Sequence, residues 1–183
     1  MQGIIFTEFL DLVDEAFGPE VTEALFEQLE LPSGGAYTRV GNYDHEEIVA
    51  LVKALSNQVN KPVAELLYSY GYYLFPRLMK LYPQRLSHCY NSFDFLYAVE
   101  NEIHTHVKKI HVSAEVPTFE FPHRDEHQMQ VIYNSKRGLA DVAHGLIARC
   151  CDHFDEAIDI ALTDLSGKDK TRVCFLLTKR AGE

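Results

Sequence analysis

Tyrosine, serine and arginine side chains alternate in the segment Tyr133-Asn134-Ser135-Lys136-Arg137. If this segment is extended, the three side chains point to one face, because side chains on a strand repeat every second residue. The Arg137 guanidinium offers a planar fork of N–H donors, and Tyr133 and Ser135 each add an O–H donor. Such donors suit a carboxylate or a phosphate, so the spacing predicts a site for an anionic group.

A histidine precedes these donors on a segment with strong helical periodicity. Residues from about 93 to 111 are predicted to form one long helix, and its inward stripe contains Leu96, Tyr97, Glu100, Ile103, His104, Val107 and Ile110. His104 would therefore enter the interior from a rigid support, which suits an axial metal ligand. An imidazole on iron and three donors for propionates would together form a haem site.

The motif Y-x-S-x-R at 133–137, the helical His104, the intervening Pro117 and the opening Met1-Gln2-Gly3-Ile4-Ile5 are in register with a known family. Together they resemble the H-NOX family, the haem-nitric oxide/oxygen binding domains related to the sensor region of soluble guanylate cyclase. The resemblance runs to the final Cys174-Phe175-Leu176-Leu177 strand. It implies a sensor without catalytic turnover, not an enzyme.

The resemblance also implies residue roles. His104 would be the axial ligand of haem b (Fe protoporphyrin IX), and Tyr133, Ser135 and Arg137 would hold its propionates. Pro117 would press on the porphyrin and distort it from planarity. Without the resemblance, His104 is more simply a packing histidine, and the three donors are the solvent face of a strand.

The gas that such a site senses depends on the distal side. Relatives that hold dioxygen use a tyrosine where this chain has Val142, and the positions that support that tyrosine are Phe9 and Leu74 here. With Ile5, Leu78 and Leu146 they would form an apolar wall. Bound O₂ gains strongly from a hydrogen-bond donor and bound NO far less, so we expect NO and CO to bind and O₂ to be excluded.

The resemblance implies an output as well. NO would break the Fe–His104 bond and shift the two parts of the fold, a two-state element biased by ligand. Because the sequence ends at Glu183 without an effector domain, the expected partner is a separate protein. Stand-alone bacterial relatives suggest a histidine kinase, a diguanylate cyclase or a cyclic-di-GMP phosphodiesterase.

The composition limits the other classes of function. The chain has 183 residues, a formal net charge of −10 and four cysteines. The acidic balance argues against a nucleic-acid partner. An opening without a signal pattern and the lack of an apolar run of about 18 residues predict a cytoplasmic protein without membrane contact. In that compartment the cysteines should be reduced thiols.

The periodicities predict an α+β fold in one domain, residues 1–183, with haem buried between two parts. The helical part, about 1–60, contains helices near 4–17, 20–29 and 46–59. The part from about 61 to 183 contains a helix from 62 that Pro76 kinks or ends, the long helix of His104, and a helix near 138–154. Its antiparallel sheet has strands near 118–121, 128–133, 156–162 and 171–177.

Three alternative interpretations stay open. His123-Arg124-Asp125-Glu126-His127 matches H-x-x-E-H, so His123, Glu126 and His127 could serve a zinc hydrolase, although the context reads as a hairpin turn. Cys150, Cys151, His153 and Cys174 could hold a structural zinc, although buried thiols fit better. A haem-free ligand-binding or scaffold module is the third.

Overall fold

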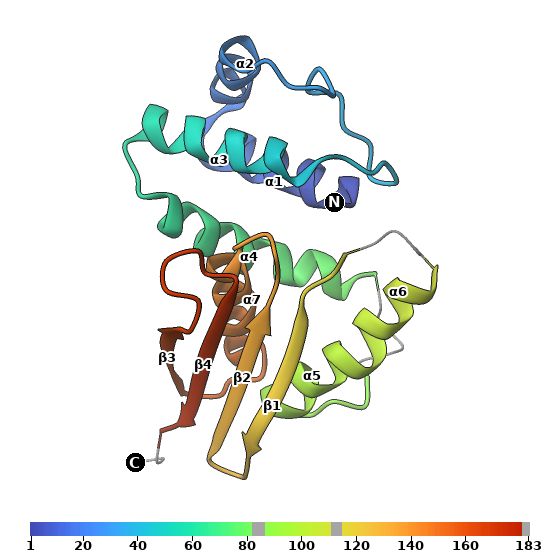
Figure 1. Cartoon of the computed structure of the whole chain (residues 1–183), viewed down its shortest axis with the longest axis vertical. Coiled ribbons are helices and arrows are strands. Elements are labelled where there is room, and N and C mark those ends of the chain that lie inside the picture. The colour runs from blue at the N-terminus through green and yellow to red at the C-terminus, as the bar shows by residue number, and fades with distance from the viewer. Residues whose placement is uncertain (82–86, 111–114, 181–183) are drawn as a thin grey trace. The chain divides into compact units, whose positions relative to one another are not determined.

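The computed structural model describes residues 1–81, 87–110 and 115–180, and the chain divides into two compact units, Met1–Tyr70 and Gly71–Glu183. Figure 1 shows the helices of the first unit in blue and cyan, and the sheet of the second in yellow to red. The helix α4 (Val63–Met79) continues through the division. The expectation of a single domain stays a prediction.

The first unit is helical, as predicted. It contains α1 (Gly3–Phe17), α2 (Pro19–Gln28), α3 (His45–Val59) and the first turns of α4. Gly18 adopts φ 95° between α1 and α2, where its lack of a side chain allows the sharp change of direction. Asp44 caps α3 by accepting a hydrogen bond from the N–H of Glu46 at 3.0 Å.

The second unit is built on a four-stranded antiparallel sheet in the order β1-β2-β4-β3. The strands are β1 (Thr118–Arg124), β2 (Gln128–Asn134), β3 (Ile158–Asp164) and β4 (Arg172–Lys179). Alternate residues of the central strands are buried, and the pairs that share this inner face are Met129 with Leu177, Val131 with Phe175 and Tyr133 with Val173. The helix α7 (Ala140–His153) lies behind the sheet in Figure 1.

The predicted helix near 93–111 is helical over its described residues, but it is not uniform. It contains α5 (Ser92–Ala98), a π-helical segment η1 (Val99–His104) and α6 (Thr105–Ile110). Asn91 caps its start by accepting a hydrogen bond from the N–H of Asp94 at 2.8 Å. The expected end at 111 falls outside the described residues. A π segment inside a helix is rare and is often found at functional sites.

The predicted α+β class is confirmed, with smaller differences at the element ends. Pro76 lies inside α4, so it does not end that helix. The hairpin strand β1 extends to Arg124, beyond the alternating residues that predicted it. Over the described ranges, none of the helices is long and apolar enough to cross a membrane.

Candidate functional site

His104 is the last residue of η1, and its ring is mostly shielded, with 13% of the side chain exposed. Its Nδ1 lies 2.7 Å from Oε2 of Glu100, one helical turn earlier. An ionised carboxylate only accepts hydrogen bonds, so Nδ1 is the donor in this contact, and in a neutral imidazole Nε2 then keeps its lone pair. Within the described part of the chain, no hydrogen bond or ion pair reaches Nε2. The histidine is therefore arranged as a ligand that still has its donor atom available.

Glu100 connects the histidine to the sheet. The same Oε2 accepts a hydrogen bond from the backbone N–H of Phe119 in β1 at 3.0 Å, and Lys108 lies 3.8 Å from Oε1. Burial alone would raise the pKa of Glu100, but the hydrogen bond from His104, with those positive and N–H contacts, lowers it below its usual range. The carboxylate thus stays charged beside the imidazole.

Phe119 joins His104 to Tyr133. Its ring centroid lies 5.3 Å from that of His104 and 6.2 Å from that of Tyr133. The strand register pairs Phe119 directly with Tyr133, and residues paired in this way project from the same face of a sheet. The inner face of β1 and β2 therefore brings the predicted iron ligand and the first predicted propionate donor to one location.

Tyr133 is a buried residue at the end of β2. Burial raises the pKa of its phenol, against the opposing effects of hydrogen bonding with Ser135 and the backbone of Leu139 and of the nearby Arg137 charge. The phenol is therefore protonated at neutral pH and can donate a hydrogen bond.

The structure corrects the expectation that 133–137 is extended throughout. The strand β2 ends at Asn134, and Ser135 Oγ accepts a hydrogen bond from the N–H of Arg137 at 3.3 Å across a turn. Gly138, at φ 62°, completes the turn before α7, where a larger residue would be strained. Ser135 and Arg137 therefore remain beside Tyr133 because of a tight turn, and strand alternation does not place them.

Arg137 has an unsatisfied donor. Its side chain is 15% exposed, and its Nη1 donates to the carbonyl oxygen of Glu115 at 2.6 Å. Its Nε is buried and has no hydrogen-bond partner among the described residues. A buried N–H without a partner is costly, and an anionic oxygen would satisfy it. The residues present therefore fit a carboxylate-bearing group such as haem.

Pro117 lies at the same end of the sheet. It immediately precedes Thr118, which pairs with Asn134. It lies two residues after Glu115, whose carbonyl oxygen accepts a hydrogen bond from Arg137. The segment around Pro117 is thus near the turn that contains Ser135 and Arg137. Its predicted contact with a porphyrin stays a prediction.

The predicted distal residues of the second unit lie on two helices in close contact. A Cβ at Gly71 of α4 would stand 2.0 Å from the carbonyl oxygen of Val142 and 3.0 Å from the backbone nitrogen of Leu146, both in α7. Leu74 and Leu78 follow on the side of α4 that carries Gly71, at helical spacing. Leu74 is buried and Leu78, Val142 and Leu146 are half-buried, so these side chains form apolar faces beside the contact.

Ile5 and Phe9 lie on α1 in the first unit, where Phe9 packs edge-on against Tyr70 with the ring centroids 5.4 Å apart. Their contribution to a distal wall stays a prediction. Tyr70, Tyr72 and Tyr73 of α4 are the nearby tyrosines whose hydroxyls could turn toward a distal pocket. Two of these hydroxyls are engaged elsewhere: Tyr70 donates to the carbonyl oxygen of Ile5 at 2.5 Å, and Tyr72 donates to Asp152 at 2.6 Å.

The alternative metal sites receive no geometric support. The residues 123–127 cover the end of β1 and the turn to β2, instead of the helix that the zinc-peptidase motif needs, and His123 contacts Asp125 at 3.0 Å. Burial raises the pKa of the Cys150 thiol well above its ordinary value and that of Cys151 to about 11. In the described ranges, no three His, Cys, Asp or Glu side chains are grouped to hold a metal ion.

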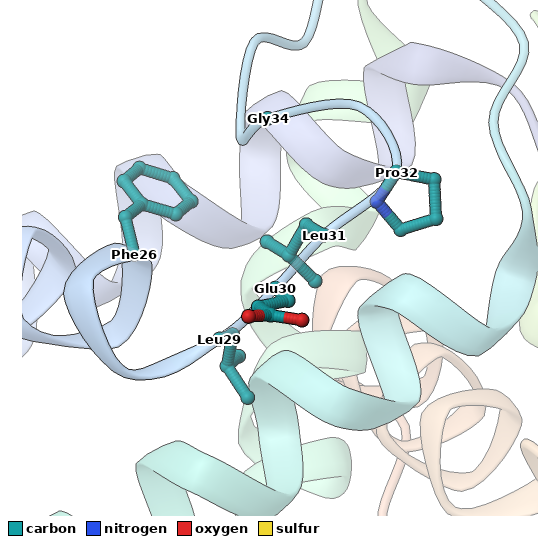
Figure 2. Close-up of a pocket in the computed structure, with 6 residues that line it drawn as sticks. All are labelled: Phe26, Leu29, Glu30, Leu31, Pro32 and Gly34. Carbon is teal, nitrogen blue, oxygen red and sulfur yellow. The ribbon is translucent and has the colours of Figure 1, made fainter.

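A pocket of about 510 Å³ lies elsewhere, in the loop that follows α2. Figure 2 shows its lining residues, Phe26, Leu29, Glu30, Leu31, Pro32 and Gly34. It contains none of the predicted site residues, and Glu30 is its one ionisable side chain. This composition offers no set of ligands for a cofactor.

Two contacts of the site were not anticipated from the sequence. Glu100 was expected on the inward stripe without a role, although the spacing of four residues from His104 places both side chains on one helix face. Phe119 was expected only as a strand residue. The motif E-x-x-x-H was the sequence signal that could have predicted the contact of Glu100 with His104. The contact of Phe119 could be predicted only from the strand register, which the sequence does not give.

Comparison with known proteins identifies the family. The model of the haem-NO-binding family matches residues 2–162. The unliganded Fe(II) H-NOX protein from K. algicida has a similar crystal structure, with TM-score 0.94 and 35% sequence identity over 100% of this chain and 98% of that one. The solution structure of the Fe(II)CO H-NOX from Shewanella woodyi, bound to IWP-051, has TM-score 0.83 and 36% identity over 100% and 97%.

The S. oneidensis H-NOX protein in the Fe(II)NO ligation state shares the fold, with TM-score 0.88 and 22% identity over 99% of this chain and 100% of that one. No curated protein matches the chain. The family match covers most of the sequence, and it includes His104 and the segment 133–137. The chain therefore belongs to the haem-NO-binding, or H-NOX, family.

Proposed function

We propose that this protein is a haem-based sensor that binds NO and CO, with haem b as its cofactor. Family membership implies haem and a sensor module that is not an enzyme. The observation that supports the assignment of residues is the pair of unused nitrogen atoms, Nε2 of His104 and the buried Nε of Arg137. One suits iron and the other suits a propionate.

His104 would hold the iron, and Arg137, Tyr133 and Ser135 would hold the propionates. The protonated phenol of Tyr133 can donate, and the guanidinium of Arg137 supplies charge as well as a directed N–H. Pro117 would contact the porphyrin from the segment that Arg137 anchors through Glu115. When bound, the haem supplies an open coordination position for a diatomic gas.

The distal wall would be made by Val142 and Leu146 of α7, Leu74 and Leu78 of α4, and Ile5 and Phe9 of α1. None of these side chains carries a hydrogen-bond donor, and the hydroxyls of Tyr70 and Tyr72 are engaged elsewhere. A pocket without a donor gives O₂ no added stabilisation, whereas NO needs little. This supports selection of NO and CO over O₂.

The output would depend on the bond between His104 and iron. NO binding would weaken that bond, and its loss would free η1 to move relative to β1, which it contacts through Glu100 and Phe119. A separate effector protein, either a histidine kinase or an enzyme of cyclic-di-GMP turnover, would detect the change. The net charge of −10 favours a partner with a basic surface.

The test is the absorption spectrum of the reduced protein, compared with that of His104→Gly prepared with and without imidazole. We expect the unchanged protein to hold haem and to give the spectrum of a five-coordinate complex with NO. Exposure to air should change its spectrum only by slow oxidation of the iron. His104→Gly should take up haem only when imidazole is supplied. The control is His123→Gly, at an exposed position in the hairpin.

Normal haem uptake by His104→Gly without imidazole would contradict the axial assignment. A stable spectrum of the O₂ complex would contradict the proposed distal wall. Loss of haem in His123→Gly alone would instead assign the iron ligand to His123 and contradict the role of His104.

A further inference from the structure

Glu100 occupies a position from which it can tune the iron ligand. Its Oε2 accepts two hydrogen bonds, from Nδ1 of His104 at 2.7 Å and from the N–H of Phe119 at 3.0 Å. Both side chains of the pair are largely shielded, with 18% of Glu100 and 13% of His104 exposed. Shielding from water strengthens a charge-assisted hydrogen bond and holds both groups in one geometry.

The backbone around this pair is also unusual. Glu100 and His104 lie within the π-helical segment η1, and the hydroxyl of Thr105 donates to the carbonyl oxygen of Glu100 at 3.3 Å. That contact helps to satisfy a carbonyl group in the altered helical pattern. The helix is therefore adapted locally where the carboxylate meets the imidazole.

We propose that Glu100 is a positioning residue that fixes the tautomer of His104 and strengthens its bond to iron; this inference rests on the proposed haem site. A carboxylate that accepts a hydrogen bond from Nδ1–H makes Nε2 a stronger electron donor, as it does in carboxylate–histidine–metal sites. A stronger bond from His104 resists cleavage when NO binds. Glu100 thus sets how readily the sensor converts gas binding into release of η1.

Glu100 also connects the proposed movement of His104 directly to the sheet. Because one oxygen atom holds both His104 and the Phe119 N–H, a displaced imidazole changes the environment of the amide at the start of β1. The partner strand residue of Phe119 is Tyr133, at the proposed propionate site. The same contact therefore links the iron ligand to the strand pair beside it.

The experiment compares Glu100→Gln with Glu102→Gln in the haem-loaded protein. Glu102 lies in the same segment but pairs with His88 at 3.1 Å, so its variant removes an equal charge without touching the His104 contact. Resonance Raman of the ferrous protein gives the iron–histidine stretching frequency. We expect that frequency to fall in Glu100→Gln only, with a higher reduction potential and a larger five-coordinate fraction after NO is added.

A frequency that is unchanged in Glu100→Gln, or that falls equally in Glu102→Gln, overturns the inference while the haem site stands. An unchanged chain that takes up no haem overturns the proposed function and this inference with it. If Glu100→Gln does not fold, NMR of the diamagnetic ferrous carbonyl form of the unchanged protein decides. The Nδ1–H of His104 should then exchange slowly with water, and rapid exchange would refute the contact.

Discussion

Gly71→Ala should destabilise the second unit, because α4 and α7 meet at this residue without space for a methyl group. The new Cβ would stand 2.0 Å from the Val142 carbonyl oxygen, 2.9 Å from its carbon and 3.0 Å from the Leu146 nitrogen. A carbon–oxygen contact normally needs about 3.3 Å, so the two helices must separate by on the order of 1 Å. All three atoms are backbone atoms, which cannot turn aside as a side chain can.

Overpacking of this kind costs about 1–3 kcal/mol, and we take the upper end for a backbone clash. Alanine is favoured over glycine in a helix by about 1 kcal/mol, which leaves a net loss of about 2 kcal/mol. For a chain of this size, that loss lowers Tm by about 4–8 °C. Thermal unfolding at equal haem content measures it, with Ser69→Ala as the control, since Ser69 is exposed on the same helix. An unchanged or higher Tm for Gly71→Ala would refute the close contact.

Three further predictions concern the site and its support. Val142→Tyr places a hydroxyl group on the proposed distal wall, so we expect weak O₂ binding in the absorption spectrum under air; a spectrum identical to that of the unchanged protein would count against the position. Arg137→Lys keeps the charge but loses the directed Nε–H, so haem affinity should fall about 10-fold to 100-fold by titration, whereas Lys136→Ala, at an exposed position, should leave it unchanged. For Glu156, burial would raise the pKa, but the hydrogen bonds from Lys179 and Ser92 outweigh it and the pKa is lowered below the ordinary 4.5. Its contribution to stability is therefore complete above that value and is lost as the pH falls through the folded-state pKa, so the difference in Tm from Glu156→Gln should be present at pH 7 and shrink in acid.

The sequence predicted those features of the site that depend on short repeats. The apolar stripe around His104 placed the imidazole on an inward helix face, and the ring is indeed mostly shielded. Alternation along 128–133 and 171–177 predicted β2 and β4, whose inner residues pair as buried neighbours. Such patterns are visible in the sequence because burial of one face requires a period of 2 or 3.6 residues.

Other features of the structure depend on contacts that a short repeat in the sequence does not predict. The π segment at 99–104 changes the hydrogen-bond spacing of a helix that the sequence indicated as regular. Leu96, Ile103 and Val107 of the predicted inward stripe are buried, but Tyr97 and Ile110 are exposed, which corrects that part of the prediction. The alternating donors at 133–137 suggested a strand, yet β2 ends at Asn134 and Gly138, at φ 62°, completes the turn that follows. The closeness of Gly71 to Val142 joins residues far apart in the chain, and the sequence gives no sign of it.

The proposed site divides two properties of a gas sensor between different elements. Which gas binds would depend on α4 and α7, where Leu74 and Val142 offer no donor and so give O₂ no advantage over NO. How the protein responds would depend on η1, where the hydrogen bond of Glu100 sets the strength of the His104 bond for any gas on the opposite side. No described contact joins Glu100 to Leu74 or Val142, and changes at sites without shared partners are close to additive. In the proposed site, selectivity and response would therefore vary separately, because a substitution at Leu74 or Val142 would leave the contacts of Glu100 and His104 intact.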